Sequence, residues 1–194
     1  EAVTGFSNAD LTVANGTLSN LTNDEGVNWT ATLTPDAGVD DHDNVITLDN
    51  TGVADTLGKA GVGTTTSNTY AVDNKGPTAT ISMADASLTI GETSLVTITF
   101  SEGVTDFDAS DLTVQNGTIG AVSTIDKGTT YTATFTPAMN VFDTENVITL
   151  NNAGVYDYYN NAGTGTTESD NYSDVTGVPV IIIPNPLPPQ ITQT

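Results

Sequence analysis

Two stretches of the chain repeat one another and decide its fold. Residues 1–17 read EAVTGFSNADLTVANGT, and residues 102–118 read EGVTDFDASDLTVQNGT. The match continues with one inserted residue: WTATLTP at 29–35 corresponds to YTATFTP at 131–137, and NVITLDNTGVAD at 44–55 to NVITLNNAGVYD at 146–157. AGVGTTTSNTY at 60–70 and AGTGTTESDNY at 162–172 complete it. Such self-similarity indicates one structural unit used twice.

Apolar and polar residues alternate within each unit, as they do in half-buried strands. In SLVTITF, the residues Val96, Ile98 and Phe100 share one face, and the intervening threonines favour strand while tolerating water. No segment of helical length shows a 3.6-residue period. For the second unit we expect strands near residues 78–83, 93–101, 111–116, 118–124, 129–136, 145–151 and 168–175. Seven short strands separated by Gly, Asn, Asp and Pro turns predict an immunoglobulin-like sandwich.

The sequence therefore predicts an all-β protein of tandem immunoglobulin-like β-sandwiches. An incomplete unit spans residues 1–74, a complete unit spans 75–177, and a Pro-rich extended tail spans 178–194. The sequence DNKGP at 73–77 links the two units. Because Glu1 aligns with Glu102, the first unit has no counterpart of residues 77–101 and lacks its two N-terminal strands.

A sandwich without two strands exposes apolar side chains and unpaired backbone groups, so a partner must cover them. One candidate is the tail, because PVIII at 179–183 aligns with PTATI at 77–81. Donation of this strand to another molecule would join identical subunits head to tail. The donor residues would be Val178, Val180, Ile181, Ile182 and Ile183. Alternatively, upstream residues supply the strands, and the tail is a linker or the start of a third unit.

The composition excludes several classes of function. A formal net charge of -21, with 3 basic residues, is incompatible with binding to a phosphate backbone, and it disfavours anionic membrane surfaces. Insertion into a membrane is not expected, since no apolar run reaches about 18 residues. There is no cysteine and only one histidine, so a catalytic constellation is not expected either. Divalent cations are the partners that this charge most favours.

The sequences FSEGVTDFDASDLTVQNGTI at 100–119, YTATFTP, NVITL and VYDYYNNAGTG at 155–165 resemble the bacterial Ig-like repeats of large biofilm and adhesion proteins. The resemblance implies a secreted stalk at the cell surface, in which neighbouring Ig-like units are often stiffened by calcium at their junctions. The usual Asp-x-Ala-Gly-Asn loop appears here as Asp157 followed by YYNNAG and as Asp55 followed by TLGKAG. The metal ligands of the family are therefore not carried over directly.

The acidic loops predict a structural calcium site. Strand order brings several loops to the linker end of the units, and calcium takes six to eight oxygen ligands of the kind that they carry. The candidate ligands are Asp41, Asp43, Asp73, Glu102, Asp106, Asp108 and Asp157. The alternative is a solvated acidic face, since Asp and Asn also favour turns for local reasons. His42, flanked by two of these residues, is interpreted as a surface residue.

Three tyrosines in the second unit, Tyr156, Tyr158 and Tyr159, form a cluster that the first unit replaces with Ala54, Thr56 and Leu57. Aromatic loops can stack on sugars or anchor a partner, so a host glycan or protein receptor is one expectation; packing at a junction is the other. The sequence thus favours a non-enzymatic, extracellular structural or adhesive module. The alternatives are a filament subunit joined by strand donation and a carbohydrate- or protein-binding module.

Overall fold

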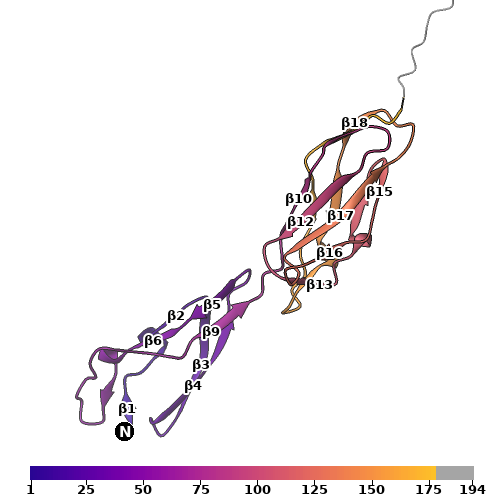
Figure 1. Ribbon diagram of the computed structural model, residues 1–194. Coiled ribbons are helices and arrows are strands. Elements are labelled where there is room, and N and C mark those ends of the chain that lie inside the picture. Colours follow the sequence, from indigo (N-terminus) through magenta and orange to yellow (C-terminus); the bar gives the residue numbers. More distant parts are fainter. Residues whose placement is uncertain (178–194) are drawn as a thin grey trace, which may run out of the picture. The chain divides into compact units, whose positions relative to one another are not determined.

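The computed structural model describes residues 1–177, which contain short strands and four 3₁₀ turns but no α-helix. The chain divides into two compact units (Figure 1). Unit 1 is Glu1–Pro77 together with Tyr156–Thr164, and unit 2 is Thr78–Val155 together with residues 165–177. The segment Tyr156–Thr164 thus belongs by its contacts to unit 1, although it lies in the second sequence repeat.

Unit 1 consists of paired strands with little buried apolar surface. Its strands are β1 (Val3–Thr4), β2 (Leu11–Val13), β3 (Gly16–Asp24), β4 (Asn28–Pro35), β5 (Asp40–Asn44), β6 (Ile46–Asp49), β7 (Ala54–Asp55), β8 (Thr64–Thr66), β9 (Tyr70–Asp73) and β20 (Tyr156–Asp157), with 3₁₀ turns η1 (Asn8–Asp10) and η2 (Asn50–Gly52). The pairs are β3 with β4, β5 with β9, β1 with β7, and β6 with both β2 and β8. Glu25 and Gly26 both have positive φ, which is the geometry of the tight turn that joins β3 to β4.

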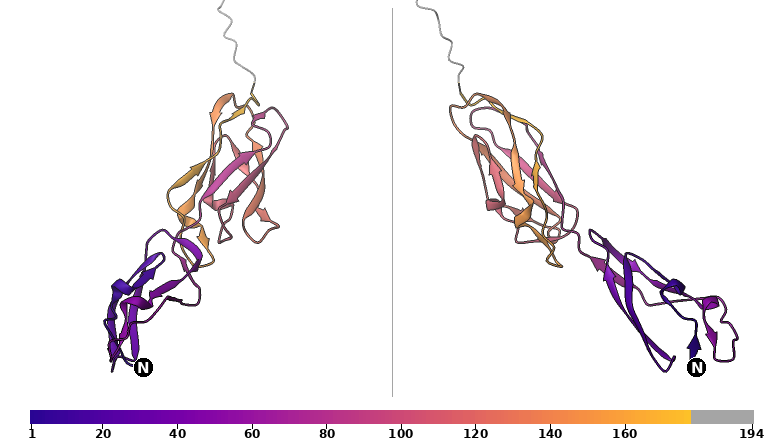
Figure 2. Two further views of the ribbon diagram at one scale, coloured as in Figure 1. Left: turned by 90° about the vertical axis from the view of Figure 1, so that its left-hand side faces the viewer. Right: turned by 180° about the vertical axis from the view of Figure 1, so that it is seen from behind.

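Unit 2 is a complete sandwich. Its strands are β10 (Ala79–Met83), β11 (Ser87–Leu88), β12 (Ser94–Phe100), β13 (Val104–Thr105), β14 (Leu112–Val114), β15 (Gly117–Ile119), β16 (Ser123–Thr124), β17 (Thr130–Pro137), β18 (Asp143–Asn146), β19 (Ile148–Asn151), β21 (Thr166–Glu168) and β22 (Tyr172–Asp174), with 3₁₀ turns η3 (Ala109–Asp111) and η4 (Asn152–Gly154). One layer runs β10-β12-β17, with β15 and β16 on the far side of β17. The other layer contains β14-β19-β21 and β11-β22-β18 (Figure 2).

The alternation seen in the sequence sets the core of unit 2. Val96, Ile98 and Phe100 of β12 are buried, as are Ala133 and Phe135 of the neighbouring β17. They form a cluster with side chains of the opposite layer, namely Ile148, Leu150 and Tyr172, all of which are 0% exposed. The expectation of an all-β, immunoglobulin-like sandwich is confirmed.

Three expected strands are each divided in the structure. The predicted strand 118–124 is split between β15 and β16. The predicted strand 145–151 is split between β18 and β19, and the predicted strand 168–175 between β21 and β22. The strands 145–151 and 168–175 both break where Ile148 and Ser169 meet. There the Ser169 hydroxyl, in place of a backbone carbonyl, accepts the N–H of Ile148 at 3.0 Å. The alternating pattern runs through this break because the side chains continue to face the core on both sides of it.

Unit 1 has no counterpart of β10 and β12 among its described residues, as expected. Apolar residues that are buried in unit 2 therefore have half-exposed equivalents in unit 1. Phe135 of β17 is 0% exposed, whereas its equivalent Leu33 in β4 is only partly buried. Trp29 packs edge-on against Phe6, with ring centroids 4.9 Å apart, and is likewise only partly buried.

Candidate functional site

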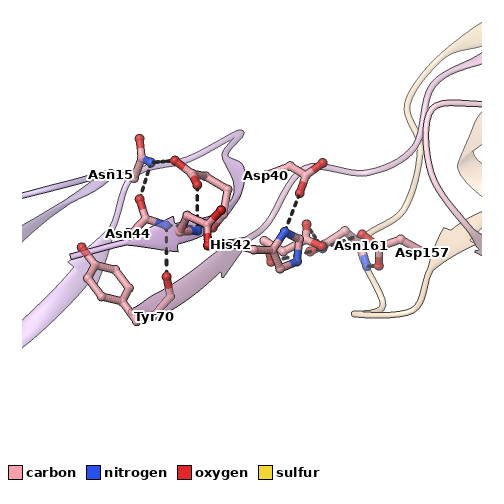
Figure 3. Close-up of polar contacts among 10 residues, drawn as sticks. Asn15, Asp40, His42, Asn44, Tyr70, Asp157 and Asn161 are labelled. Atoms are coloured by element: carbon pink, nitrogen blue, oxygen red, sulfur yellow. Dashed lines mark hydrogen bonds and ion pairs between the residues drawn. The ribbon is translucent and has the colours of Figure 1, made fainter. Parts of the chain in front are cut away.

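The densest group of ionisable side chains in unit 1 lies on the β5–β9 pair. Asp40 and Asp73 are directly opposite one another in this antiparallel ladder, which places their side chains on the same face. His42 lies two residues beyond Asp40, and its Nδ1 is 3.6 Å from Asp40 Oδ1 (Figure 3). One atom of each of these three side chains lies within 4.8 Å of the others.

The segment Tyr156–Thr164 adds a buried carboxylate to this group. Asp157 is 2% exposed, and its Oδ1 accepts the backbone N–H groups of Tyr159 and Asn161, each at 2.8 Å. The Asn161 side chain donates to Asp157 Oδ2 at 2.8 Å and to Asp73, at the backbone carbonyl and at Oδ1, each at 3.3 Å (Figure 3). Asn161 therefore ties this loop to the end of β9.

Burial and nearby negative charge both act on the pKa of Asp73. Burial raises the pKa of this carboxyl group above 3.8, and the charges of Asp157 and Asp40 raise it further. A hydrogen bond from the Lys75 backbone and the nearby His42 oppose the shift. The protonated form of Asp73 is consequently favoured by folding, because burial and the neighbouring carboxylates outweigh these two opposing effects.

The predicted ligands Asp41 and Asp43 are engaged differently from Asp73 and Asp157. Asp41 Oδ2 accepts from the Asn15 side chain at 2.9 Å, and its Oδ1 accepts the Asp43 backbone N–H at 3.0 Å. Asn15 also donates to Asn44 at 2.6 Å, so Asp41 belongs to a network that fixes the turn before β3 (Figure 3). The Asp43 side chain is exposed. The structure therefore places Asp73 and Asp157 in the cluster on β9 and gives Asp41 a local structural role.

The remaining predicted ligands, Glu102, Asp106 and Asp108, belong to unit 2, and their convergence with the carboxylates of unit 1 stays a prediction. Asp108 caps η3: its Oδ1 accepts the Ser110 N–H at 2.6 Å, and hydrogen bonding from Ser110 lowers the pKa of Asp108 below 3.8. Asp106 has a φ of 62°, a left-handed conformation that Asp tolerates in tight turns. For these two residues, the turn geometry accounts for the residue type.

Two members of the cluster, Asp40 and Asn161, were not among the predicted site residues. Asp40 aligns with Phe142 in the second repeat, so comparison of the repeats gives no reason to select it. Asn161 carries no charge and follows another asparagine in a loop. The pairing of β5 with β9 shows that Asp40 lies opposite Asp73, and the hydrogen bond from the loop 156–164 to β9 shows that Asn161 lies beside Asp73.

The tyrosine loop is exposed in part. Tyr158 and Tyr159 have 64% and 61% of their surface accessible, whereas Tyr156 is partly buried in β20. Tyr159 also contacts His42, with ring centroids 6.0 Å apart. Tyr159 thus packs beside the acidic cluster, and binding of a partner by this loop stays a prediction. The tail residues Val178, Val180, Ile181, Ile182 and Ile183 lie outside the described residues.

The donor chemistry of the cluster suits a hard cation in part. Asp40 and Asp73 supply carboxylate oxygens of the kind that calcium prefers. Asp157 already accepts three hydrogen bonds, which engage both of its carboxylate oxygens. A cation at this place would therefore be held mainly by Asp40 and Asp73, with His42 at its edge.

Together, the duplicated β-architecture and an acidic loop cluster define a tandem repeat protein of immunoglobulin-like sandwiches. The bacterial Ig-like domain family matches residues 1–72 and again residues 73–173, and the chain belongs to that family. Such domains are typically non-catalytic structural modules of extracellular proteins. No curated protein and no solved structure matches the chain. Among the described residues, no helix is both long and apolar enough to cross a membrane.

Proposed function

We propose that this chain is a spacer segment of a bacterial surface adhesin or extracellular fibre, in which Ig-like units are arranged in tandem. The observation that carries the proposal is the match of both repeats to one structural domain family. The charge of -21 supports it, because a strongly acidic segment resists association with its own copies and with anionic surfaces. Repeats that contact mainly their neighbours are suited to spanning distance rather than to enclosing a substrate.

Surface labelling tests this proposal. Antibodies raised against the chain are applied to intact source cells, to cells treated with an external protease, and to lysed cells. We expect labelling of intact cells that the protease removes. Labelling that appears only after lysis would contradict the extracellular assignment.

We further propose that calcium binds beside Asp40 and Asp73 and offsets the repulsion between the carboxylates around Asp73. The support is the raised pKa of Asp73, since a divalent cation would favour its ionised form. Isothermal titration calorimetry after chelator treatment should give calcium heat that Asp40→Asn and Asp73→Asn each reduce. Glu25→Gln, at the exposed tip of the β3–β4 hairpin, is the matched control for loss of one charge. Equal heats in all four proteins would exclude this site.

A second candidate function is that of a filament subunit, and the unpaired edge of β4 favours it. An exposed strand edge can accept a strand from another chain, and head-to-tail acceptance produces filaments. Negative-stain electron microscopy of the purified chain distinguishes the two functions. Filaments of regular repeat, lost on deletion of residues 178–194, would support the subunit; discrete particles in both proteins would support the spacer.

A further inference from the structure

Two loops of the protein have the same construction. In the first, Asp55 Oδ1 accepts the backbone N–H groups of Leu57 and Lys59 at 2.9 and 2.8 Å. In the second, Asp157 Oδ1 accepts those of Tyr159 and Asn161, both at 2.8 Å. Each loop also closes with an isolated bridge to an alanine, Ala54 to Ala60 and Tyr156 to Ala162. The two loops therefore share one backbone structure, which we call the template. A segment that packs against one copy of it indicates what kind of segment can pack against the other.

The second loop is covered by the chain's own linker. Asn161 holds Asp73 by two hydrogen bonds, and Gly76 approaches the loop so closely that a Cβ atom on it would lie 1.9 Å from the carbonyl oxygen of Ala162. Pro77, which follows, is buried. The sequence Asp-Asn-Lys-Gly-Pro at 73–77 thus fits the template through an acidic residue and a glycine without a side chain.

The first loop instead borders an open cavity of about 600 Å³. Its lining includes Val3, Val53, Ala54, Lys59 and Gly61. Val53 is only partly buried, whereas its equivalent Val155 is 0% exposed. The loop at 54–60 therefore has open space and exposed apolar side chains at the position where the loop at 156–162 contacts the linker.

Charge indicates what the cavity accepts. Lys59 occupies the position of Asn161, the residue that donates hydrogen bonds to Asp73. An ammonium group at that position donates to a carboxylate more strongly than a neutral amide does. It is one of the 3 basic residues in the chain, and it lines the cavity. Because Glu1 and Asp55 also line the cavity, the acidic linker residue is complementary to the position of Lys59 and not to the cavity as a whole.

The sheet beside the cavity supplies the second half of the surface. In unit 2, β17 is paired on one side with β15 and on the other with β12. Its equivalent β4 is paired with β3 alone among the described residues. The register of β12 places Ser94, Val96 and Ile98 opposite Phe135, Ala133 and Tyr131. The equivalents of these three β17 residues in β4 are Leu33, Ala31 and Trp29. None of them is fully buried, so a strand equivalent to β12 could lie opposite them.

We propose that unit 1 carries a continuous docking surface for the linker and first two strands of another repeat of this kind. The linker carboxylate pairs with Lys59, and a glycine-proline step follows over Ala60. The second of the two strands then adds antiparallel to β4, with alternating apolar residues over Ala31 and Trp29. The partner is a segment with the chemistry of residues 73–101, and the inference rests on the proposed tandem arrangement.

The test places a copy of residues 73–101 directly before Glu1. This junction is natural for the repeat, because residue 101 is followed by Glu102, the equivalent of Glu1. Trp29, the only tryptophan, reports on β4 alone. We expect its emission to shift to shorter wavelength, acrylamide quenching to fall, and the unfolding midpoint followed by Trp29 to rise.

Two matched variants separate the parts of the surface. Replacing the copied Val96, Ile98 and Phe100 by Thr retains length, charge and strand propensity but should abolish the shift of Trp29 emission. Changing the copied Asp73 to Asn should lower the midpoint in the parent but not in Lys59→Ala, since the two changes remove the same ion pair.

Unchanged emission on extension, or an equal shift with the threonine variant, would overturn the proposal. A shift produced instead by a copy of residues 178–194 would overturn it in favour of strand donation by the tail. Surface labelling of cells is independent of these outcomes. A negative result in the docking test would therefore not contradict the spacer function. Labelling of lysed cells alone would contradict the spacer function but not a positive docking test.

Discussion

Asp73 is the residue whose charge most directly affects unit 1. Its pKa is raised in the folded protein, chiefly by burial and then by Asp157. A carboxyl group of this kind stabilises the fold when protonated, and that contribution is lost as the pH rises through its folded-state pKa. At neutral pH without calcium, ionised Asp73 therefore weakens unit 1.

Asp73→Asn should accordingly raise the melting temperature of unit 1 at pH 7 in chelator. The amide keeps an oxygen to accept from Asn161 and removes the repulsion, which for a partly exposed pair amounts to less than about 1 kcal/mol. Below the ordinary Asp pKa of 3.8, the variant and the parent should converge. Thermal scans followed by Trp29 fluorescence measure this, with Glu25→Gln as the control. A destabilised variant at pH 7 would show that ionised Asp73 is favourable.

Tyr158 carries the prediction for a binding role of the tyrosine loop. It is 64% exposed, whereas Tyr159 packs beside His42. If the loop binds sugars, Tyr158→Ala should remove binding on a glycan array without changing the melting temperature, because little buried surface is lost. Tyr156→Ala is the contrasting variant, since its partly buried side chain lies in β20. An array with no glycan bound by the parent protein would contradict the binding role.

At the scale of the strands, comparing two equivalent residues shows how much stability the cover provided by β10 and β12 contributes. Phe135 in β17 is 0% exposed and contacts Tyr172, with ring centroids 5.0 Å apart. Its equivalent Leu33 in β4 is half-buried. Phe135→Ala should destabilise unit 2 by about 3–5 kcal/mol, the usual cost of removing a buried aromatic side chain.

Leu33→Ala should cost less than the about 2–5 kcal/mol that is typical of a fully buried leucine, because solvent already reaches it. Denaturant unfolding followed by amide hydrogen exchange in β17 for unit 2, and by Trp29 fluorescence for unit 1, gives both values. Equal losses would mean that β4 is covered in solution. The copied strands before Glu1 should then bring the cost of Leu33→Ala toward the buried value.

The strands themselves could be predicted from the sequence, because a period of two in SLVTITF and YTATFTP leaves little choice of face. The acidic cluster could be predicted only in part. Asp73 and Asp157 follow from loop positions, but Asp40 depends on a register that shifts between Asp41 and Asn44 of β5. Asn161 depends on a loop that joins unit 1 across 88 residues of sequence. A shift in strand register and a contact between residues far apart in the sequence leave no periodic pattern in the local sequence, so neither could be predicted from it.

At the scale of the whole molecule, the two units bury their apolar residues unequally. Unit 2 fully buries Leu88, Val96, Ile98 and Leu150, whereas the buried apolar residues of Glu1–Pro77 are Val72, at 4%, and Pro77. Burial of apolar surface is the main favourable term in folding. The units should therefore unfold in separate steps, unit 1 first, and a single two-state transition should not describe the chain.

The position of the only tryptophan makes this measurable in one titration. Trp29 lies in unit 1, and the fully buried Tyr172 lies in unit 2. As denaturant rises, Trp29 emission should change before the amide protection of β17 and of Tyr172 is lost. Calcium should bring the two midpoints closer if the cluster around Asp73 binds it, because a ligand stabilises only the folded form to which it binds. Coincident midpoints without calcium would show that unit 1 does not unfold independently, and that the open edge of β4 costs less stability than its exposed apolar surface indicates.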